Sequence, residues 1–388
     1  MSDILYVSNS CVEKFTNDMS STSVSTSEEY NNNIVIANEY VLGRLISSGG
    51  FGSVHYGFSL HTHKVVAIKL ENTNTIKHEY LKNEYEIMRE LNTPIDGFNM
   101  TGIPKIYWFG KQDDYTVMVM DLLGMNIEML NVSIDKVIKQ QHTLEKTLVP
   151  TETINTNTNT NTKTLPYMNK LKYILVLKIA FKLLVIIENL HKQGYIHKDI
   201  KPHNILINND YNVKQGLISS HPPEIYIIDF GLTEKLYTDD GEHITKRRTG
   251  KFTGTVKYMS RNTHDGIQQS RADDLESFMY FVLHLLNIKL PWSDVIINQP
   301  KQQSPNGDEE TEKQQILRKK ERILKVKEIK LNVDYVELCK KHNVPDELFD
   351  DIVKLTEYVR GLSFYSIPDY FYMKKLLSDA HLRLTSTF

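Results

Sequence analysis

Hydrophobic and polar residues alternate along the first part of the chain, with glycines between the apolar runs. The alternation covers 39–60, 64–71, 104–110 and 115–123. This period of two predicts β-strands joined by turns. One segment among them, 78–92, carries apolar residues three and four positions apart and therefore predicts a helix that ends near Asn92.

From 167 onward the helical period dominates, with short predicted strands at 204–208 and 225–231. The pattern therefore predicts the α+β class. A small β-rich lobe at 37–122 precedes a larger helical lobe at 123–385.

Three segments lack a hydrophobic period. Residues 1–36 are rich in Ser, Thr and Asn, 131–165 contains NTNTNTNTKT, and 298–315 is polar. Such composition buries little apolar surface, so we expect a disordered tail and two low-complexity inserts in solvent.

The most apolar stretch, 171–190, is interrupted by Lys172, Lys178, Lys182 and Glu188. Charges at the centre of a bilayer are costly, so we expect a buried helix and no membrane span.

Composition is that of a globular protein, with 40% hydrophobic and 24% charged residues and a net charge of −2. This charge favours neither nucleic acid nor membrane as a partner. The two cysteines, Cys11 and Cys339, indicate neither a disulfide framework nor a metal site. With no secretory signal visible, we expect a cytoplasmic protein, the nucleus being open as a second compartment.

A glycine-rich stretch, ISSGGFGSV at 46–54, lies between two predicted strands. Glycines let backbone N–H groups approach phosphate oxygens, although such a hairpin is more often only a turn. Ser47 stands where the pattern G-x-G-x-x-G has its first glycine, and Gly49 and Gly52 supply the other two.

Lys69 ends the apolar run VVAIK, and Glu84 lies on the following predicted helix. A lysine at this place is usually a solvated strand end. Beside a glycine-rich loop, however, it can hold phosphate oxygens while Glu84 positions its amine.

The segment 195–204, YIHKDIKPHN, fits H-x-D-x-x-x-x-N. Asp199 can accept a hydroxyl proton, and Lys201 can neutralise charge on a transferring phosphoryl group. Asn204 and Asp229, the latter in IIDFGL, can bind Mg²⁺. Each piece alone is a surface loop, but the ordered combination is specific for phosphoryl transfer.

With these motifs the sequence resembles protein kinases, and among them the casein kinase 1 family. The resemblance runs from about 38 to about 382, apart from 131–165, 209–222 and 298–315. TGTVKYMSRNTH and GIQQSRADDLESF resemble segments of that family, and Ser260-Arg261-Asn262 stands where other kinases have Ala-Pro-Glu. A poxvirus-type relative is the alternative subfamily.

The resemblance implies a bilobal protein-kinase fold, the cofactors ATP and Mg²⁺, and Ser/Thr specificity, since Lys201 follows Asp199 by two positions. It implies Asp199, Lys201, Lys69, Glu84 and Thr255 as catalytic residues, with Asp274 bracing their loop. The residues it implies for ATP binding are Ile46, Ser47, Ser48, Gly49, Gly50, Phe51, Gly52, Ser53, Val54, Ala67, Lys69, Met120, Asp121, Leu123 and Leu206.

Substrates of this family tend to be acidic or already phosphorylated. Lys198, Lys257, Arg261 and Lys319 are therefore expected to form an anion pocket, although a solvated basic face is the simpler interpretation. Lys198 replaces the arginine that relatives have after His197, which loses a bidentate fork but keeps the charge.

An active Ser/Thr kinase, monomeric and acting on protein substrates, is the main hypothesis. A pseudokinase that binds nucleotide as a scaffold is the alternative, supported only by Ser47 and Lys198. A pure interaction protein using the Asn/Thr insert is disfavoured, because Lys69, Asp199, Asn204 and Asp229 are all present.

Overall fold

The chain divides into two compact units in the computed structural model. The first runs to Gly124 and includes Asp229–Gly231, and the second comprises Met125–Ile228 and Leu232–Phe388. The described residues are 34–50, 52–75, 79–94, 100–148, 164–250, 252–297 and 312–386.

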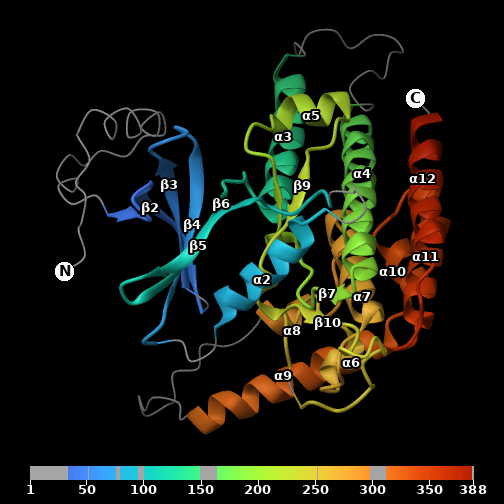
Figure 1. Cartoon of the computed structure of the whole chain (residues 1–388). Coiled ribbons are helices and arrows are strands. Elements are labelled where there is room, and N and C mark those ends of the chain that lie inside the picture. The colour runs from blue at the N-terminus through green and yellow to red at the C-terminus, as the bar shows by residue number, and fades with distance from the viewer. Residues whose placement is uncertain are drawn as a thin grey trace, which may run out of the picture. The chain divides into compact units, whose positions relative to one another are not determined.

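The first unit is built on a six-stranded sheet in which every neighbouring pair is antiparallel (Figure 1). In spatial order the strands are β1 (Val35–Ile36), β2 (Tyr40–Gly49), β3 (Gly52–Ser59), β4 (Val65–Asn72), β6 (Tyr115–Asp121) and β5 (Ile106–Gln112). Alternate residues of these strands form one buried cluster that includes Val66, Ile68, Val117 and Val119. The period of two in the sequence is therefore the period of this core.

Strand β1 corrects the predicted N-terminal boundary. Val35 pairs with Val41 and Ile36 with Tyr40, although both Val35 and Ile36 fall in the expected disordered tail. Two residues are too short to produce an alternation, which is why the pattern missed them. The rest of that predicted tail, 1–33, lies outside the described residues.

Helix α2 (Tyr80–Asn92) forms where the sequence predicts it. It buries Leu81, Glu84, Met88 and Leu91, which lie three to four positions apart and so share one face. Glu84 is the only charged residue among the buried positions of this helix.

The second unit is mostly helical. Its helices are α3 (Ile127–Leu148), α4 (Thr164–Lys192), α5 (Val213–Ser219), α6 (Arg261–His264), α7 (Arg271–Leu285), α8 (Ser293–Ile297), α9 (Glu312–Asn332), α10 (Tyr335–Lys341), α11 (Asp346–Gly361) and α12 (Tyr370–Ser386). Within it, α4 lies alongside α12 (Figure 1). Short strand pairs, β7 (Tyr195–Ile196) with β10 (Glu234–Lys235) and β8 (Ile205–Ile207) with β9 (Ile225–Ile227), frame its loops. The predicted α+β architecture, strands first and helices after, is confirmed.

The expected insert at 131–165 is shorter than predicted. Helix α3 continues to Leu148 and buries Leu130, Ile134 and Ile138 at helical spacing. Residues 149–163, which hold most of the Asn/Thr repeat, lie outside the described residues, as do 298–311 of the second insert. Residues 312–315 of that second insert already belong to α9.

The lysines of the apolar stretch 171–190 belong to α4 and bond to groups of other segments. Lys172 is buried and donates to Asp135 at 2.6 Å and to Asn287 at 3.0 Å. Lys178 donates to the carbonyl of Ser220. The stretch is thus a helix of the protein interior, and over the described ranges no helix is long and apolar enough to cross a membrane.

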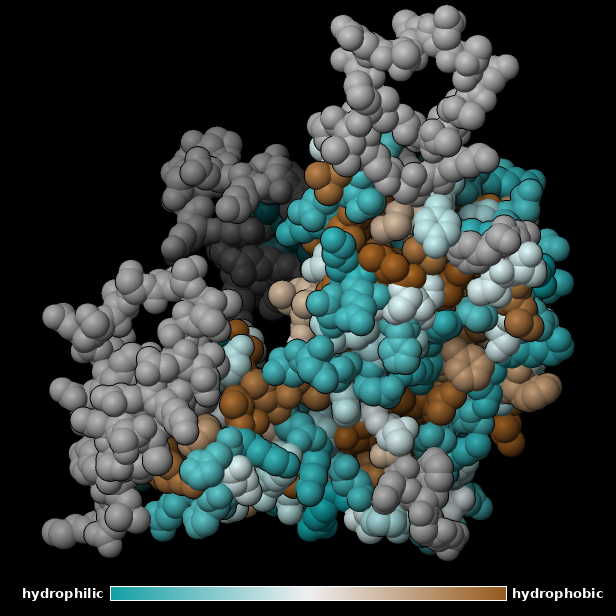
Figure 2. All heavy atoms as spheres, turned by 90° about the horizontal axis from the view of Figure 1, so that it is seen from above, coloured by the Kyte–Doolittle hydropathy of each residue, from teal (hydrophilic) through white to brown (hydrophobic). Residues whose placement is uncertain are grey.

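The described surface is chemically mixed. In the view of Figure 2, hydrophilic residues are interleaved with smaller hydrophobic areas over the coloured part of the molecule. This agrees with the ordinary globular composition of the sequence.

Candidate functional site

The glycine-rich stretch forms a tight β-hairpin at the end of β2 and β3. Ser47 pairs with Val54, Ser48 with Ser53 and Gly49 with Gly52. Gly52 has φ +123°, and a Cβ there would lie 2.0 Å from the carbonyl oxygen of Leu70. Only glycine fits at this position.

The other positions of the hairpin tolerate side chains. Ser47 pairs with Val54 just after a register shift between Leu45 and Ser47, and it is not among the residues with positive φ, so its backbone does not require glycine. A Cβ at Gly49 or Gly50 would meet nothing within 4 Å. The protein itself therefore does not require glycine at these two places, and they leave room for a ligand close to the backbone. Phe51, expected to contact ATP, lies outside the described residues.

Lys69 of β4 lies between two carboxylates of the first unit. Its Nζ donates to Oε2 of Glu84 at 2.6 Å and lies 3.7 Å from Oδ1 of Asp229. Burial disfavours the ammonium, but the two carboxylates outweigh burial and raise the pKa of Lys69. The amine is thus held charged and in a fixed position.

Asp229 has φ +69°, a left-handed conformation that is uncommon for a residue other than glycine. Such strain concentrates at functional positions. Gly231 follows, and the nearest atoms to a Cβ built there are Oδ1 of Asp229 at 3.7 Å and Cβ of Tyr80 at 3.9 Å.

Four of the residues expected to bind ATP, Ile46, Val54, Ala67 and Met120, lie on neighbouring strands of the first unit. Ala67 of β4 is the register partner of Met120 in β6, and both are buried. Val54 of β3 is the partner of Lys69, whereas Ile46 is 42% exposed. This places four of the expected contacts on consecutive strands of one sheet.

Three further residues expected to bind ATP, Asp121, Leu123 and Leu206, differ in their surroundings. The carboxylate of Asp121 accepts the amide of Lys105 at 2.8 Å and the hydroxyl of Tyr107 at 2.5 Å. Leu123 follows the end of β6. Leu206 belongs to the second unit, where its strand β8 pairs with β9. Asp121, the last residue of β6, is thus held to Lys105 and Tyr107 at the start of the neighbouring strand β5.

In the second unit, three polar side chains surround Asp199, which lies in the loop after β7. Oδ1 accepts the amide of Thr255 at 2.9 Å and its hydroxyl at 3.0 Å. Oδ2 accepts from Nζ of Lys201 at 2.5 Å and from the amide of Asn204 at 3.2 Å. The carboxylate is buried and held in one orientation, with both oxygens engaged.

Lys201 and Asn204 are held in turn by the same loop. Nζ of Lys201 also donates to Oγ1 of Thr255 at 3.0 Å, and Asn204 donates to the carbonyl of Asp199 at 3.0 Å. Because Asn204 uses its nitrogen here, its carbonyl oxygen is the atom suited to a cation. An amide oxygen and a carboxylate, such as that of Asp229, are hard oxygen ligands that suit Mg²⁺.

Gly254 lets the segment carrying Thr255 approach this loop. It has φ +91°, and a Cβ at this position would lie 2.8 Å from the carbonyl oxygen of Lys198. The glycine of TGT is therefore required by close backbone contact.

Asp274, in the first turn of α7, braces the loop from a buried position. Its Oδ1 accepts the amide of Lys198 at 2.8 Å, and its Oδ2 accepts the amide of His197 at 2.7 Å and Nε2 of His191 at 2.9 Å. Burial opposes the charge, but the hydrogen bond and the nearby imidazoles outweigh it and lower the pKa of Asp274.

Two members of this network were not found from the sequence. Nδ1 of His191 lies 2.6 Å from the hydroxyl of Tyr370, so a chain of bonds joins Asp274, His191 and Tyr370. Tyr370 and His191 are 179 positions apart. No local pattern signals a contact of that kind.

Two members of the expected anion pocket, Lys198 and Arg261, form ion pairs with carboxylates of the protein. Nζ of Lys198 pairs with Glu234 at 2.6 Å, and the lysine side chain is 8% exposed. Arg261 donates to Glu276 at 3.1 Å and to the carbonyl of Arg360 at 3.1 Å. Each of these cations thus has a carboxylate partner within the protein, and their role in an anion pocket stays a prediction.

Lys257 has a different environment. Its Nζ lies 3.3 Å from Nδ1 of His284, whose Nε2 lies 2.8 Å from Glu128. Burial lowers the pKa of Lys257, against the attraction of Glu128. The side chain of Lys319, on α9, lies outside the described residues.

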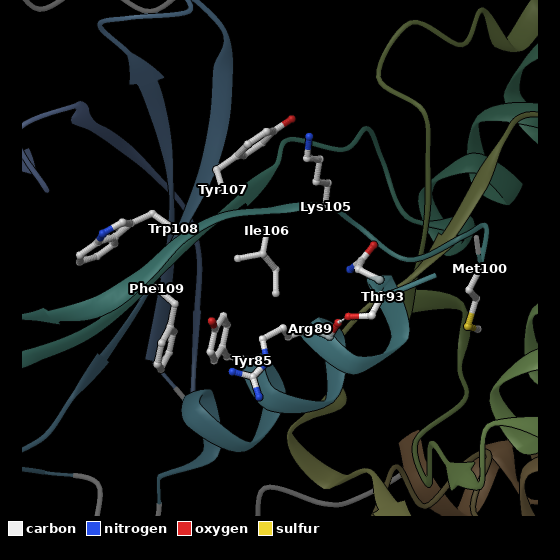
Figure 3. A pocket seen from close by; sticks show the side chains of 10 residues that line it. Tyr85, Arg89, Thr93, Met100, Lys105, Ile106, Tyr107, Trp108 and Phe109 are labelled. Carbon is white, nitrogen blue, oxygen red and sulfur yellow. Dashed lines mark hydrogen bonds between the residues drawn. The ribbon is translucent and has the colours of Figure 1, made fainter. Parts of the chain in front are cut away.

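The first unit also contains a hollow of about 630 Å³ beside α2 and β5. Figure 3 shows the ring of Tyr85 beside that of Phe109, and the two rings stack with centroids 4.0 Å apart. None of the residues that line the hollow is among the expected ATP contacts. It is a separate feature, next to the helix that carries Glu84.

The two units thus hold complementary chemical groups. One fixes a lysine ammonium between carboxylates beside a glycine hairpin, and the other fixes a carboxylate beside a lysine and an amide. These groups suit phosphate binding and proton acceptance. Comparison with known protein families matches residues 40–346 to the family described as protein kinase domain, and this chain is therefore a member of that family.

Proposed function

We propose that this kinase domain transfers the γ-phosphoryl group of Mg-ATP to Ser and Thr hydroxyls of proteins. We extend the domain to 35–385, so that it includes β1, and assign it to the casein kinase 1 family. The observation that carries the proposal is the fixed carboxylate of Asp199, beside Lys201 and Thr255.

In this proposal Asp199 orients the substrate hydroxyl and accepts its proton as the new oxygen–phosphorus bond forms and the bond to ADP breaks. Lys201, 2.5 Å from the carboxylate, neutralises charge on the transferring group. Thr255 keeps the carboxylate from rotating, since it donates twice to one oxygen.

Nucleotide binding is assigned to the first unit. The amine of Lys69, held by Glu84, would contact phosphate oxygens, and the hairpin at Gly49 and Gly50 would cover them. Asn204 and Asp229 would hold Mg²⁺, which neutralises phosphate charge when bound.

The casein kinase 1 assignment is supported by the segment after Thr255. Where most kinases have Ala-Pro-Glu, this chain has Ser260-Arg261-Asn262, and the structure gives these residues specific partners. Ser260 donates to Asp273 at 2.5 Å, and Arg261 pairs with Glu276. The segment is thus stabilised by an ion pair of its own.

A pseudokinase would bind nucleotide without transferring phosphate. The two features that favoured it have structural explanations, because Ser47 fits its strand and Lys198 pairs with Glu234. Purified protein incubated with Mg-ATP and a peptide array decides between the two. The proposal expects phosphate on Ser and Thr, whereas nucleotide binding with no phosphopeptide would support the pseudokinase.

We further propose that Lys257 favours acidic or pre-phosphorylated substrates, with Lys319 as a second cation. Charge-assisted hydrogen bonds contribute roughly 1.5–3 kcal/mol each. Lys257→Glu should therefore reduce the preference for a phosphorylated over a neutral peptide by about tenfold or more.

The exposed lysine Lys325, exchanged in the same way, is the matched control for Lys257→Glu. Equal preference ratios in wild type and Lys257→Glu would refute the role of Lys257. The ratio compares two peptides on one enzyme, so it is insensitive to a general loss of activity.

A further inference from the structure

Lys330, near the end of α9, is a fully buried lysine outside the proposed catalytic set, with a relative exposure of 0%. Its Nζ donates to the carbonyl of Met259 at 2.6 Å and to that of Val256 at 3.0 Å. It also lies 4.8 Å from the ring centre of Tyr280 and 4.9 Å from that of Trp292. Carbonyl oxygens and aromatic faces both attract a cation.

Lys257 lies between Val256 and Met259 in the sequence, and its carbonyl accepts from another buried side chain. Nε1 of Trp292 donates to the carbonyl of Lys257 at 2.8 Å. Three carbonyls of 256–259 are therefore fixed from one side by Lys330 and Trp292, whose ring packs edge-on against Tyr280. We call Lys330 and Trp292 the carbonyl clamp.

The clamped segment begins one residue after Thr255. Thr255 donates its amide and its hydroxyl to Asp199 and accepts from Lys201. One peptide plane, 255–256, separates the plane of the Val256 carbonyl from that of the Thr255 amide, so a shift of Val256 can reach Thr255 through two shared Cα atoms. The clamp is thus one residue away from the group that fixes the proposed base.

We propose that Lys330 is a positioning residue for phosphoryl transfer, acting through Val256 and Thr255 on the carboxylate of Asp199. This inference rests on the proposed function for its kinetic part and on the structure alone for its effect on 255–259. It predicts an effect on turnover and none on ATP affinity, since Lys330 lies outside the proposed ATP contacts.

The surroundings of Lys330 bring the pKa of its ammonium close to neutral pH. Burial lowers the pKa of Lys330 to about 7, against the attraction of Glu276 on α7. On α6, burial and the charges of Lys330 and Lys327 lower the pKa of His264 to about 3, so this imidazole stays neutral. Arg360 of α11 donates to the carbonyl of Lys330.

The test compares Lys330→Met with Lys325→Met, an exposed lysine of the same helix. Methionine keeps an unbranched side chain that is one atom shorter and removes its donors. We expect kcat to fall at least about tenfold, with KM for ATP unchanged. This factor corresponds to the loss of one charge-assisted hydrogen bond at the low end of the usual range of strengths. Amide hydrogen exchange in 255–259 should accelerate in Lys330→Met and stay at the wild-type rate in Lys325→Met.

Lys330→Arg keeps the charge, so its activity should exceed that of Lys330→Met. Arginine stays protonated, so the ratio of wild-type to Lys330→Arg turnover should fall as pH rises through about 7. Trp292→Phe removes the Nε1 donor together with part of the buried ring, keeps an aromatic face, and should change exchange and kcat in the same direction as Lys330→Met. It decides the matter if Lys330→Met does not fold.

A folded Lys330→Met protein with wild-type kcat, or with reduced kcat but unchanged exchange in 255–259, would overturn the proposal. If the wild-type protein transfers no phosphate, the proposed function fails instead. The exchange measurement alone then decides whether Lys330 holds this segment.

Discussion

At the scale of single residues, the candidate catalytic loop depends on one buried carboxylate. Asp274 accepts two backbone amides and one imidazole, and these three donors fix the start of the segment that bears Asp199. A carboxylate suits this place because its two oxygens accept bonds and donate none.

Asp274→Asn should destabilise the fold by about 1–3 kcal/mol, because the amide group would turn a donor towards buried donors. Thermal unfolding monitored by circular dichroism measures this change. Asp294→Asn is the control, since Asp294 is 52% exposed and pairs with Lys289 at the surface. Equal unfolding temperatures for the two variants would contradict the bracing role.

Wild type and Asp274→Asn should also differ in how their stability depends on pH. The pKa of Asp274 is lowered in the fold from its ordinary value of 3.8, because its imidazole partners outweigh burial. The carboxylate therefore stabilises the native state above pH 3.8, and this contribution is lost as the pH falls through its folded pKa. The stability gap between wild type and Asp274→Asn should be largest near neutral pH and shrink in acid. A gap that grows on acidification would exclude this linkage.

At the scale of elements, the hairpin of β2 and β3 was visible in the sequence because glycine and alternation are local signals. The reason for each glycine was not. Gly52 is required by its own sheet, where a Cβ would meet Leu70, whereas Gly49 and Gly50 are free of such contacts. The sequence alone does not distinguish these two cases.

Gly52→Ala should lower the unfolding temperature, since a left-handed conformation and a backbone clash cost of order 1–3 kcal/mol. Gly50→Ala should leave the unfolding temperature near that of wild type, because no atom lies within 4 Å of its Cβ position. Differential scanning calorimetry of both variants without nucleotide checks this. A larger loss for Gly50→Ala than for Gly52→Ala would refute the assignment.

Elements with long, regular periods were predicted well, and elements defined by partners were not. Helix α2 and the strands from β2 to β6 follow the hydrophobic pattern. The two residues of β1 are too short to show an alternation, and the pattern missed the part of α3 beyond 130 although Ile134 and Ile138 are buried at helical spacing. Lys172 shows what a local pattern cannot predict, because the partners that bond this buried lysine lie 37 and 115 positions away in the sequence.

At the scale of the whole molecule, the motifs predicted which residue types meet but not which charges remain available. Lys69 contacts Glu84, and Asp199 contacts Lys201 and Thr255; these residues were singled out by the motifs and, for Thr255, by the family resemblance. Lys198 and Arg261 were expected to bind anions, but each lies beside a carboxylate from another element. A motif fixes a residue type, and only the fold shows its counter-charge.

The central claim, that Asp199 serves as the base of a phosphoryl transfer, is tested most directly by the rate of γ-phosphate transfer in Asp199→Asn. Asparagine keeps the size of the side chain but cannot accept the hydroxyl proton. Wild type should transfer phosphate from Mg-ATP to a Ser/Thr peptide, and the variant should turn over at least about 10²-fold more slowly. Its melting temperature and its affinity for ATP, measured alongside, should confirm that it is folded and binds nucleotide. Equal turnover in wild type and folded Asp199→Asn would contradict the account.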